Sequence, residues 1–206
     1  MAPCGRDGGR GGIVSGLLAI VSGPSGVGKT TITRAVVDRI DDAELSVSAT
    51  TRPIRPGETE GVDYFFKAPE QFDEMVRRGE LLEWADVFGN RYGTPVAWVN
   101  ERLAAGRVVV LEIDVQGAVQ VKRNRPDAFG VFILPPNEEA LLDRLRRRAR
   151  EGEDVIQRRF AEAKREIADA HASGAYDVFI VNDNLESAID QAVRALQSRR
   201  GVPGGA

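Results

Sequence analysis

A glycine-rich octapeptide contains the residues best suited to chemistry. The pattern G-x-x-x-x-G-K-[ST] is matched by Gly23, Pro24, Ser25, Gly26, Val27, Gly28, Lys29 and Thr30. Its glycines let the backbone curl so that successive N–H groups point at one anion, beside the N-terminus of a helix. The Lys29 charge suits the β- and γ-phosphates of a nucleotide, and the Thr30 hydroxyl suits Mg²⁺. The octapeptide therefore predicts a binding site for the polyphosphate of a nucleotide with Mg²⁺, and GTPases, ATPases and small-molecule kinases all share such a loop.

A second phosphate-binding group follows in a proline-constrained turn. Arg52 and Arg55 are three positions apart, and two forked guanidinium groups at this spacing can hold one phosphate bidentately. A second phosphate-binding group of this kind argues against the hypothesis that the protein is a regulatory phosphate-loop ATPase or GTPase. The guanine motif N-K-x-D of common GTPases is not matched either, because the nearest residues, 182–184, read Asn-Asp-Asn.

Strands and helices alternate around these groups. Short apolar runs predict buried strands over 17–22, 107–113, 130–134 and 176–181. Apolar residues at helical spacing predict helices over 29–40, 137–150, 154–171 and 185–197. Strands separated by helices imply an α/β fold, with a parallel sheet and helices on both of its faces. Such a fold places its ligands at the carboxyl ends of the strands.

Composition and charge narrow the class of protein. The 206 residues are 42% hydrophobic and 29% charged, which is typical of a soluble globular domain. The net charge of −3 argues against a strongly basic nucleic-acid-binding protein. The single cysteine, Cys4, cannot form an internal disulfide, and no apolar run approaches the ~20 residues that span a bilayer. We therefore expect a cytoplasmic protein with no nucleic-acid or membrane partner.

Further motifs, taken in order, closely resemble the guanylate kinase family, whose members phosphorylate GMP with ATP. They are GPSGVGKT, SVSATTRPIRPGE, GVDYFF, LLEWA, YGTP, LEIDVQG, an arginine-rich stretch and IVND. Together they cover about residues 15–198, nearly the whole of the expected fold. The resemblance implies a nucleoside monophosphate kinase that transfers the γ-phosphoryl group of ATP to GMP, and also to dGMP, in purine nucleotide metabolism and GMP recycling.

The resemblance also implies how the chain is divided. A phosphate-loop core is expected over 13–46, 98–139 and 169–198, a GMP-binding insert over 47–97, and an arginine-rich lid over 140–168. The glycine-rich leader, 1–12, and the tail, 199–206, are expected to be disordered and flexible.

Residue roles follow from the resemblance by position. The GMP site would be formed by Ser48, Arg52, Arg55, Glu58, Tyr64, Glu83, Tyr92, Thr94 and Asp114. The residues of this set that would read the guanine are Ser48, Glu83, Thr94 and Asp114. ATP would lie on residues 23–30, with Asn182 near the adenine. Lys29 and Arg52 would act in catalysis with the lid residues Arg144, Arg148 and Arg159. Mg²⁺ would be held by Thr30 and Glu112, partly through water.

The chemistry of guanine agrees with these roles. A carboxylate such as Glu83 can accept from both N1–H and N2–H₂, and the Thr94 hydroxyl can donate to O6. Adenine would leave a buried acceptor unpaired there, and such mispairing rejects an analogue by roughly 10⁴-fold. Glu112 and Asp114, two positions apart at the end of one predicted strand, would share a face. The acceptor phosphate needs no general base because its second pKa is about 6.

Two alternatives stay open from the sequence. The chain could be another nucleoside monophosphate kinase, which Glu83 and Thr94 argue against. It could also be a catalytically inactive guanylate-kinase-like module that binds peptides, which the intact octapeptide and the lid arginines argue against. ATP and GMP are the expected substrates, and a monomer or small homo-oligomer is the expected assembly.

Overall fold

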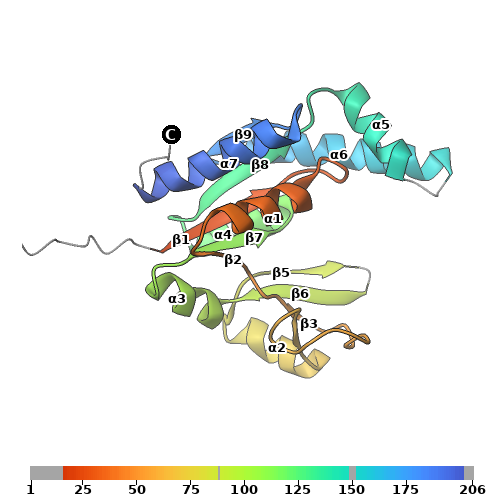
Figure 1. The fold of residues 1–206 in the computed structure, drawn as a ribbon. Helices are drawn as coiled ribbons and strands as arrows, with labels where there is room; N and C mark the ends of the chain where they lie inside the picture. Colours follow the sequence, from red (N-terminus) through yellow and green to blue (C-terminus); the bar gives the residue numbers. More distant parts are fainter. Residues whose placement is uncertain (1–15, 88, 149–151, 202–206) are drawn as a thin grey trace, which may run out of the picture.

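A five-stranded parallel sheet forms the centre of the molecule (Figure 1). The computed structural model describes residues 16–87, 89–148 and 152–201; the predicted leader, 1–12, lies outside them. The strands are, in spatial order, β2 (Ala43–Leu45), β7 (Val108–Glu112), β1 (Leu17–Ser22), β8 (Phe129–Leu134) and β9 (Val178–Val181). All neighbouring pairs are parallel. The predicted α/β fold is confirmed, with β2 as a short edge strand that the sequence did not predict.

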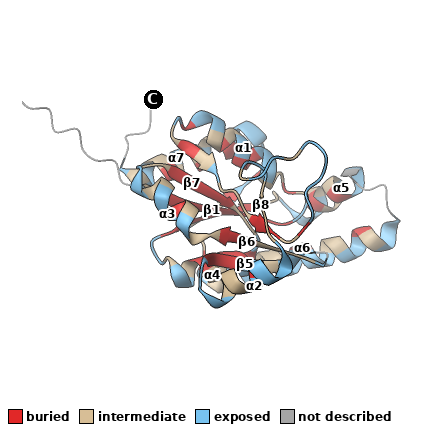
Figure 2. Cartoon of the chain, turned by 90° about the horizontal axis from the view of Figure 1, so that it is seen from below, coloured by how far each residue is buried: buried red, intermediate tan, exposed pale blue. Residues whose placement is uncertain are grey.

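Side chains of the central strand alternate between two hydrophobic cores. Leu17, Ala19 and Val21 pack on one face, beneath α1 (Lys29–Arg39) and α7 (Leu185–Arg200). Leu18 and Ile20 pack on the other face, with α3 (Val96–Ala104) and α4 (Val115–Asn124). Figure 2 shows the buried residues gathered on the strands between these helices. Full burial of each such side chain contributes about 1.5–3 kcal/mol, which fixes the sheet that carries the site.

A second, mixed sheet lies below the first in Figure 1. Its order is β4 (Phe65–Phe66), β3 (Ala49–Thr50), β6 (Asn90–Pro95) and β5 (Leu81–Val87). The helix α2 (Pro69–Arg77) covers it and buries Phe72 fully against Ala49 and Leu81. The sequence predicted an insert here but none of these strands, because two of them span only two residues and offer no periodicity.

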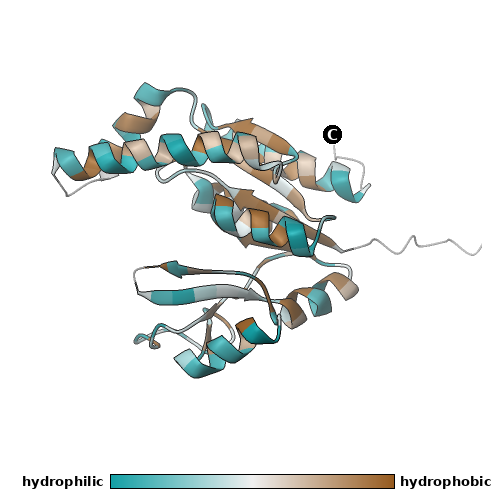
Figure 3. Cartoon of the chain, turned by 180° about the vertical axis from the view of Figure 1, so that it is seen from behind, coloured by the Kyte–Doolittle hydropathy of each residue, from teal (hydrophilic) through white to brown (hydrophobic). Residues whose placement is uncertain are grey.

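Two helices, α5 (Glu138–Arg148) and α6 (Glu153–Ser173), project beyond the parallel sheet. They share a small apolar core of Leu141, Leu145, Ile156 and Ala163. Figure 3 shows α6 as one long helix with hydrophilic residues recurring along its length. Within the ranges described above, no helix combines the length and apolarity that crossing a bilayer requires.

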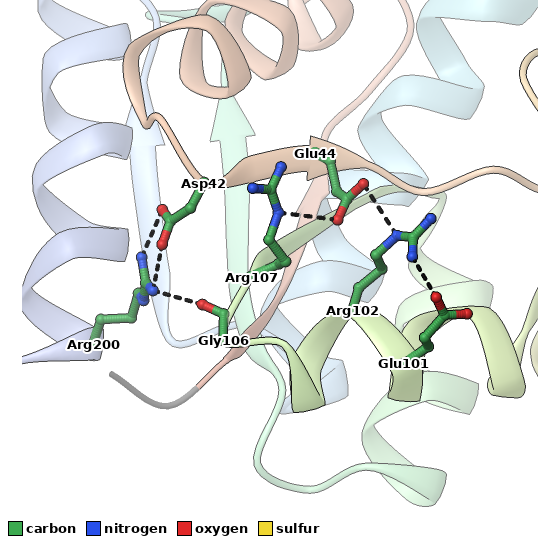
Figure 4. A network of polar contacts seen from close by, with 7 residues as sticks. All are labelled: Asp42, Glu44, Glu101, Arg102, Gly106, Arg107 and Arg200. Carbon is green, nitrogen blue, oxygen red and sulfur yellow. Dashed lines mark hydrogen bonds and ion pairs between the residues drawn. The ribbon is translucent and has the colours of Figure 1, made fainter. Parts of the chain in front are cut away.

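The end of α7 is anchored beside the residues that precede β2 and β7 (Figure 4). Arg200 donates to both carboxylate oxygens of Asp42, at 2.8 and 2.6 Å, and to the Gly106 carbonyl at 2.7 Å. Beside it, Glu44 contacts Arg102 and Arg107 at 3.3 Å each. The helix α7 therefore continues to Arg200, past its predicted end at 197, so the first two residues of the predicted flexible tail are helical.

Substitution Arg200→Ala is expected to lower the free energy of unfolding by about 1–2 kcal/mol at pH 7, since it removes charge-assisted hydrogen bonds whose acceptor is partly solvated. Arg200 lowers the pKa of Asp42 below its ordinary value. The pair therefore stabilises the fold above about pH 4, and this contribution is lost as the pH falls through the lowered pKa. Urea titrations from pH 7 to 3 measure the effect, with Arg194→Ala, at an exposed position of the same helix, as control. A loss independent of pH would contradict this account.

Candidate active site

The octapeptide forms a loop between β1 and α1, as its pattern predicts. Gly26 and Gly28 have φ of +88° and +97°, in the left-handed region that favours glycine. Gly28 caps the N-terminus of α1, so the free N–H groups of the first turn adjoin the loop. The loop lines a cavity of about 360 Å³ together with Thr31, Glu112 and Glu166. We name this space the phosphate-loop cavity, because its backbone donors and helix N-terminus suit an anion.

Lys29, Thr30 and Glu112 meet at this cavity. The Lys29 Nζ donates to the Gly23 carbonyl at 3.3 Å. The Thr30 Oγ1 donates to Glu112 Oε1 at 2.6 Å, and Glu112 is the last residue of β7. A hydroxyl and a carboxylate side by side are hard oxygen ligands, and Mg²⁺ typically takes one or two such ligands besides phosphate and water. This donor set therefore fits Mg²⁺.

A second cavity, of about 350 Å³, lies on the α7 side of the loop. Its lining residues are Gly26, Val27, Gly28, Thr31, Arg144, Arg147, Asn182, Asp183 and Leu185. The buried Asn182 donates its side-chain amide to the Val27 carbonyl at 2.7 Å, so it braces the loop directly. Because two loop glycines line both cavities, one elongated ligand can occupy them together.

One arginine of α6 contacts the same loop, and one of α5 lines the second cavity beside it. Arg144 donates to the Asn182 carbonyl at 2.9 Å, and Arg159 donates to Ser25 Oγ at 2.8 Å. The side chain of Arg148 lies outside the described residues. Glu166, which the sequence analysis missed, also lines the phosphate-loop cavity. Burial raises its pKa, and the charge of Lys29 opposes that rise. The sequence could have indicated Glu166, because it lies seven residues after Arg159, about two helical turns, and therefore on the same face of α6.

A third cavity, of about 330 Å³, draws on both sheets. We name it the inter-sheet cavity; its lining residues are Lys29, Ser48, Tyr64, Glu83, Ala85, Val87, Tyr92, Glu112, Ile113 and Asp114. Lys29 and Glu112 line both this cavity and the phosphate-loop cavity. Two ligands, one in each, would therefore meet at the Lys29 charge.

Arg52 lies beside the inter-sheet cavity and is already oriented. Its guanidinium donates to both oxygens of Glu58, at 2.6 and 3.1 Å, and lies 5.2 Å from the ring centre of Tyr64. This guanidinium lowers the pKa of Glu58. The Glu58 carboxylate thus holds Arg52, while its predicted contact with GMP stays a prediction. Arg55 is exposed on the same turn and donates its backbone N–H to Glu58.

Glu83 and Thr94 form a buried pair at the wall of the inter-sheet cavity. The Thr94 Oγ1 donates to Glu83 Oε1 at 2.6 Å. Burial raises the pKa of Glu83, and the charge of Asp114 adds to the rise. Thr94 was predicted to donate to guanine O6. That contact stays a prediction; the bond to Glu83 shows that Thr94 also orients the carboxylate that faces the cavity.

Asp114 reaches the cavity from a helix rather than a strand. The strand β7 ends at Glu112, and Asp114 is the N-cap of α4, with Oδ1 accepting from the Gly117 N–H at 2.8 Å. The predicted alternation of Glu112 and Asp114 along one strand is therefore wrong. Both side chains still line the inter-sheet cavity, because the strand-to-helix turn brings the cap back over the sheet edge.

Comparison with known proteins agrees with this geometry. The family model "Guanylate kinase" matches residues 15–199. The guanylate kinase of Thermobifida fusca is 51% identical over 84% of this chain and 87% of its own, and that of Gloeobacter violaceus is 51% identical over 87% and 86%. The crystal structure of guanylate kinase from Anaplasma phagocytophilum is 31% identical, with a TM-score of 0.66, over 91% of this chain and 87% of its own. The chain belongs to the guanylate kinase family.

Proposed function

We propose that the protein transfers the γ-phosphoryl group of ATP to GMP, giving ADP and GDP, and that the three cavities divide this work. The observation that carries the proposal is the meeting of the phosphate-loop and inter-sheet cavities at Lys29 and Glu112. Guanylate kinase activity itself follows from the family and from identities near 50% over most of the chain. Residue roles, domain bounds and the use of Mg²⁺ are our assignments.

The ATP triphosphate would lie on the backbone N–H groups of 23–30, with its adenine end toward Asn182 and α7. GMP would occupy the inter-sheet cavity, with its base against Glu83 and its phosphate toward Arg52, Tyr64 and Tyr92. The insert, 47–97, and the lid, 140–168, are then the parts that bring the two nucleotides together. Residues 13–46, 98–139 and 169–198 supply the core that holds them.

Catalysis in this arrangement rests on positioning and charge. The acceptor oxygen of GMP is largely ionised at neutral pH, since its second pKa is about 6, so the chain needs no general base. Lys29 neutralises negative charge that spreads over the transferred group. Arg144 and Arg159, in the lid, cover the same group from the other side. Thr30 and Glu112 would hold Mg²⁺, which supplies further neutralisation of the phosphate oxygens when bound. Closure over both substrates would keep water from the γ-phosphate.

A coupled assay of ADP release with Mg²⁺ and ATP tests the proposal across GMP, dGMP, AMP, CMP and UMP. We expect turnover of GMP and dGMP, and a kcat/KM for AMP lower by about 10³-fold or more, because a buried carboxylate would face the adenine lone pair. A reaction without monophosphate gives the ATP hydrolysis background. Preference for another monophosphate would favour a different nucleotide kinase. No ADP release with any of the five would favour an inactive binding module.

A further inference from the structure

We propose that Gln120, on α4, is a positioning residue for base recognition, because its side-chain amide pairs with the backbone of β5 next to Glu83 and so fixes that carboxylate in the inter-sheet cavity. The inference rests on the proposed function, in which Glu83 reads the guanine. It assigns specificity partly to a helix of the core, outside the expected insert, 47–97.

The strand that carries Glu83 needs outside support. The strand β5 is the edge strand of the second sheet. Its pairing with β6 shifts register between Leu81 and Trp84, so Glu83 lies within the irregularity. A bulge of this kind re-aims a side chain at the cost of ladder hydrogen bonds. An edge strand also leaves backbone groups unpaired on its outer side. Backbone pairing with β6 therefore fixes this part of β5 poorly, although the Thr94 hydroxyl on β6 holds the Glu83 carboxylate itself.

Side-chain amides of α4 supply the bonds that the outer edge lacks. The Trp84 N–H donates to Gln120 Oε1 at 3.2 Å, and Gln120 Nε2 donates to the Trp84 carbonyl at 3.1 Å. The side-chain amide of Gln120 thus hydrogen-bonds both the N–H and the carbonyl of Trp84, as a residue of a neighbouring antiparallel strand would. One turn further along α4, Asn124 Nδ2 donates to the Leu82 carbonyl at 2.8 Å. The two contacts fall on the residues immediately before and after Glu83.

The first turn of α4 contacts the carboxylate itself. A Cβ added at Gly117 would lie 3.2 Å from Glu83 Oε2 and 3.4 Å from Asp114 Oδ1. Glycine therefore lets the helix backbone approach the Glu83 side chain closely. The same helix bonds the Trp84 backbone through Gln120. A shift of β5 along α4 would consequently move Glu83 relative to Asp114, which shares its cavity. Displacements of about 1 Å are enough to impair a site of this kind.

Gln120→Leu keeps the side-chain bulk and removes both hydrogen bonds. We expect the KM for GMP to rise about five- to tenfold, with kcat at saturating GMP and the KM for ATP changed less than twofold. Gln120→Glu keeps the acceptor for the Trp84 N–H but loses the donor, so its KM for GMP should be intermediate. Gln116→Leu, an exposed glutamine one turn earlier on α4, is the matched control and should leave all three constants unchanged.

Amide hydrogen exchange of the nucleotide-free protein gives a readout independent of activity. We expect the Trp84 N–H to exchange faster in Gln120→Leu than in the parent protein or in Gln116→Leu. The inference is overturned if the KM for GMP stays the same or falls, or if the constants for ATP and GMP change equally. If Gln120→Leu does not fold, Gln120→Glu carries the same test. Failure of the parent protein to phosphorylate GMP would instead refute the proposed function, which the parent assay establishes first.

Discussion

Lys29→Ala is expected to lower kcat by about 10³-fold or more while leaving the affinity for GMP within about threefold. Lys29 lines both the phosphate-loop and inter-sheet cavities, so in the proposed arrangement it lies where the transferred group would pass. Its loss removes charge stabilisation at the point where negative charge spreads during transfer. The part of the inter-sheet cavity proposed to hold the guanine, around Glu83, is left unchanged by the substitution. Steady-state ADP release measures kcat, and calorimetry with GMP measures affinity.

The chain offers a matched lysine as a control for this substitution. Lys164 is exposed on α6 and pairs with Glu138 at 2.9 Å, a contact worth at most about 1 kcal/mol. Lys164→Ala should therefore retain nearly full activity. Lys29 also begins α1, so circular dichroism must show that Lys29→Ala keeps its helix content. Unfolding of the variant would make Lys29 a structural residue. A loss in kcat below tenfold would remove it from the transfer step.

The parallel core could be predicted because its signals are local. The buried strands β1, β7 and β8 are continuous apolar runs, the pattern of a sheet covered on both faces. The edge strand β2 has three residues, of which only Ala43 is buried, and it carries no such signal. The phosphate loop was equally readable, since its pattern, its glycines and its strand–helix context lie within one short segment.

The second sheet was not predictable for a physical reason. The strand β5 is buried at its first three residues and mostly exposed afterwards. Regular alternation is therefore lost. The strands β3 and β4 exist only through their pairing with partners elsewhere in the chain. Local pattern predicts an insert here, but only tertiary contacts make it a sheet.

Site residues could be named from the motifs, but their mutual contacts could not. The bond from Thr94 to Glu83 joins two strands, β6 and β5, that the sequence did not predict. The bonds of Gln120 join positions 36 residues apart. Thr94 was predicted as a ligand contact and Gln120 was not predicted at all, yet the structure shows that each of them contacts the residue or strand that carries the expected base contact. Glu58, which holds Arg52, follows the same pattern.

Arg52→Ala is expected to raise the KM for GMP by about 10²-fold while changing the KM for ATP less than threefold. The substitution removes a guanidinium that can hold the GMP phosphate bidentately, a charge-assisted contact. It also frees the Glu58 carboxylate, which Arg52 now neutralises at 2.6 Å. An unpaired carboxylate beside the expected phosphate would repel it, so two effects act in the same direction.

The double variant Arg52→Ala with Glu58→Gln separates these effects. We expect it to recover part of the lost GMP affinity, about three- to tenfold, because removing the uncompensated carboxylate relieves repulsion without restoring the phosphate contact. Arg78→Ala, an exposed arginine on the outside of the insert, serves as the control and should behave as the parent protein. Equal rises in the KM for ATP and GMP in Arg52→Ala would place Arg52 outside the GMP site. A double variant no better than the single one would show that Glu58 acts only through Arg52.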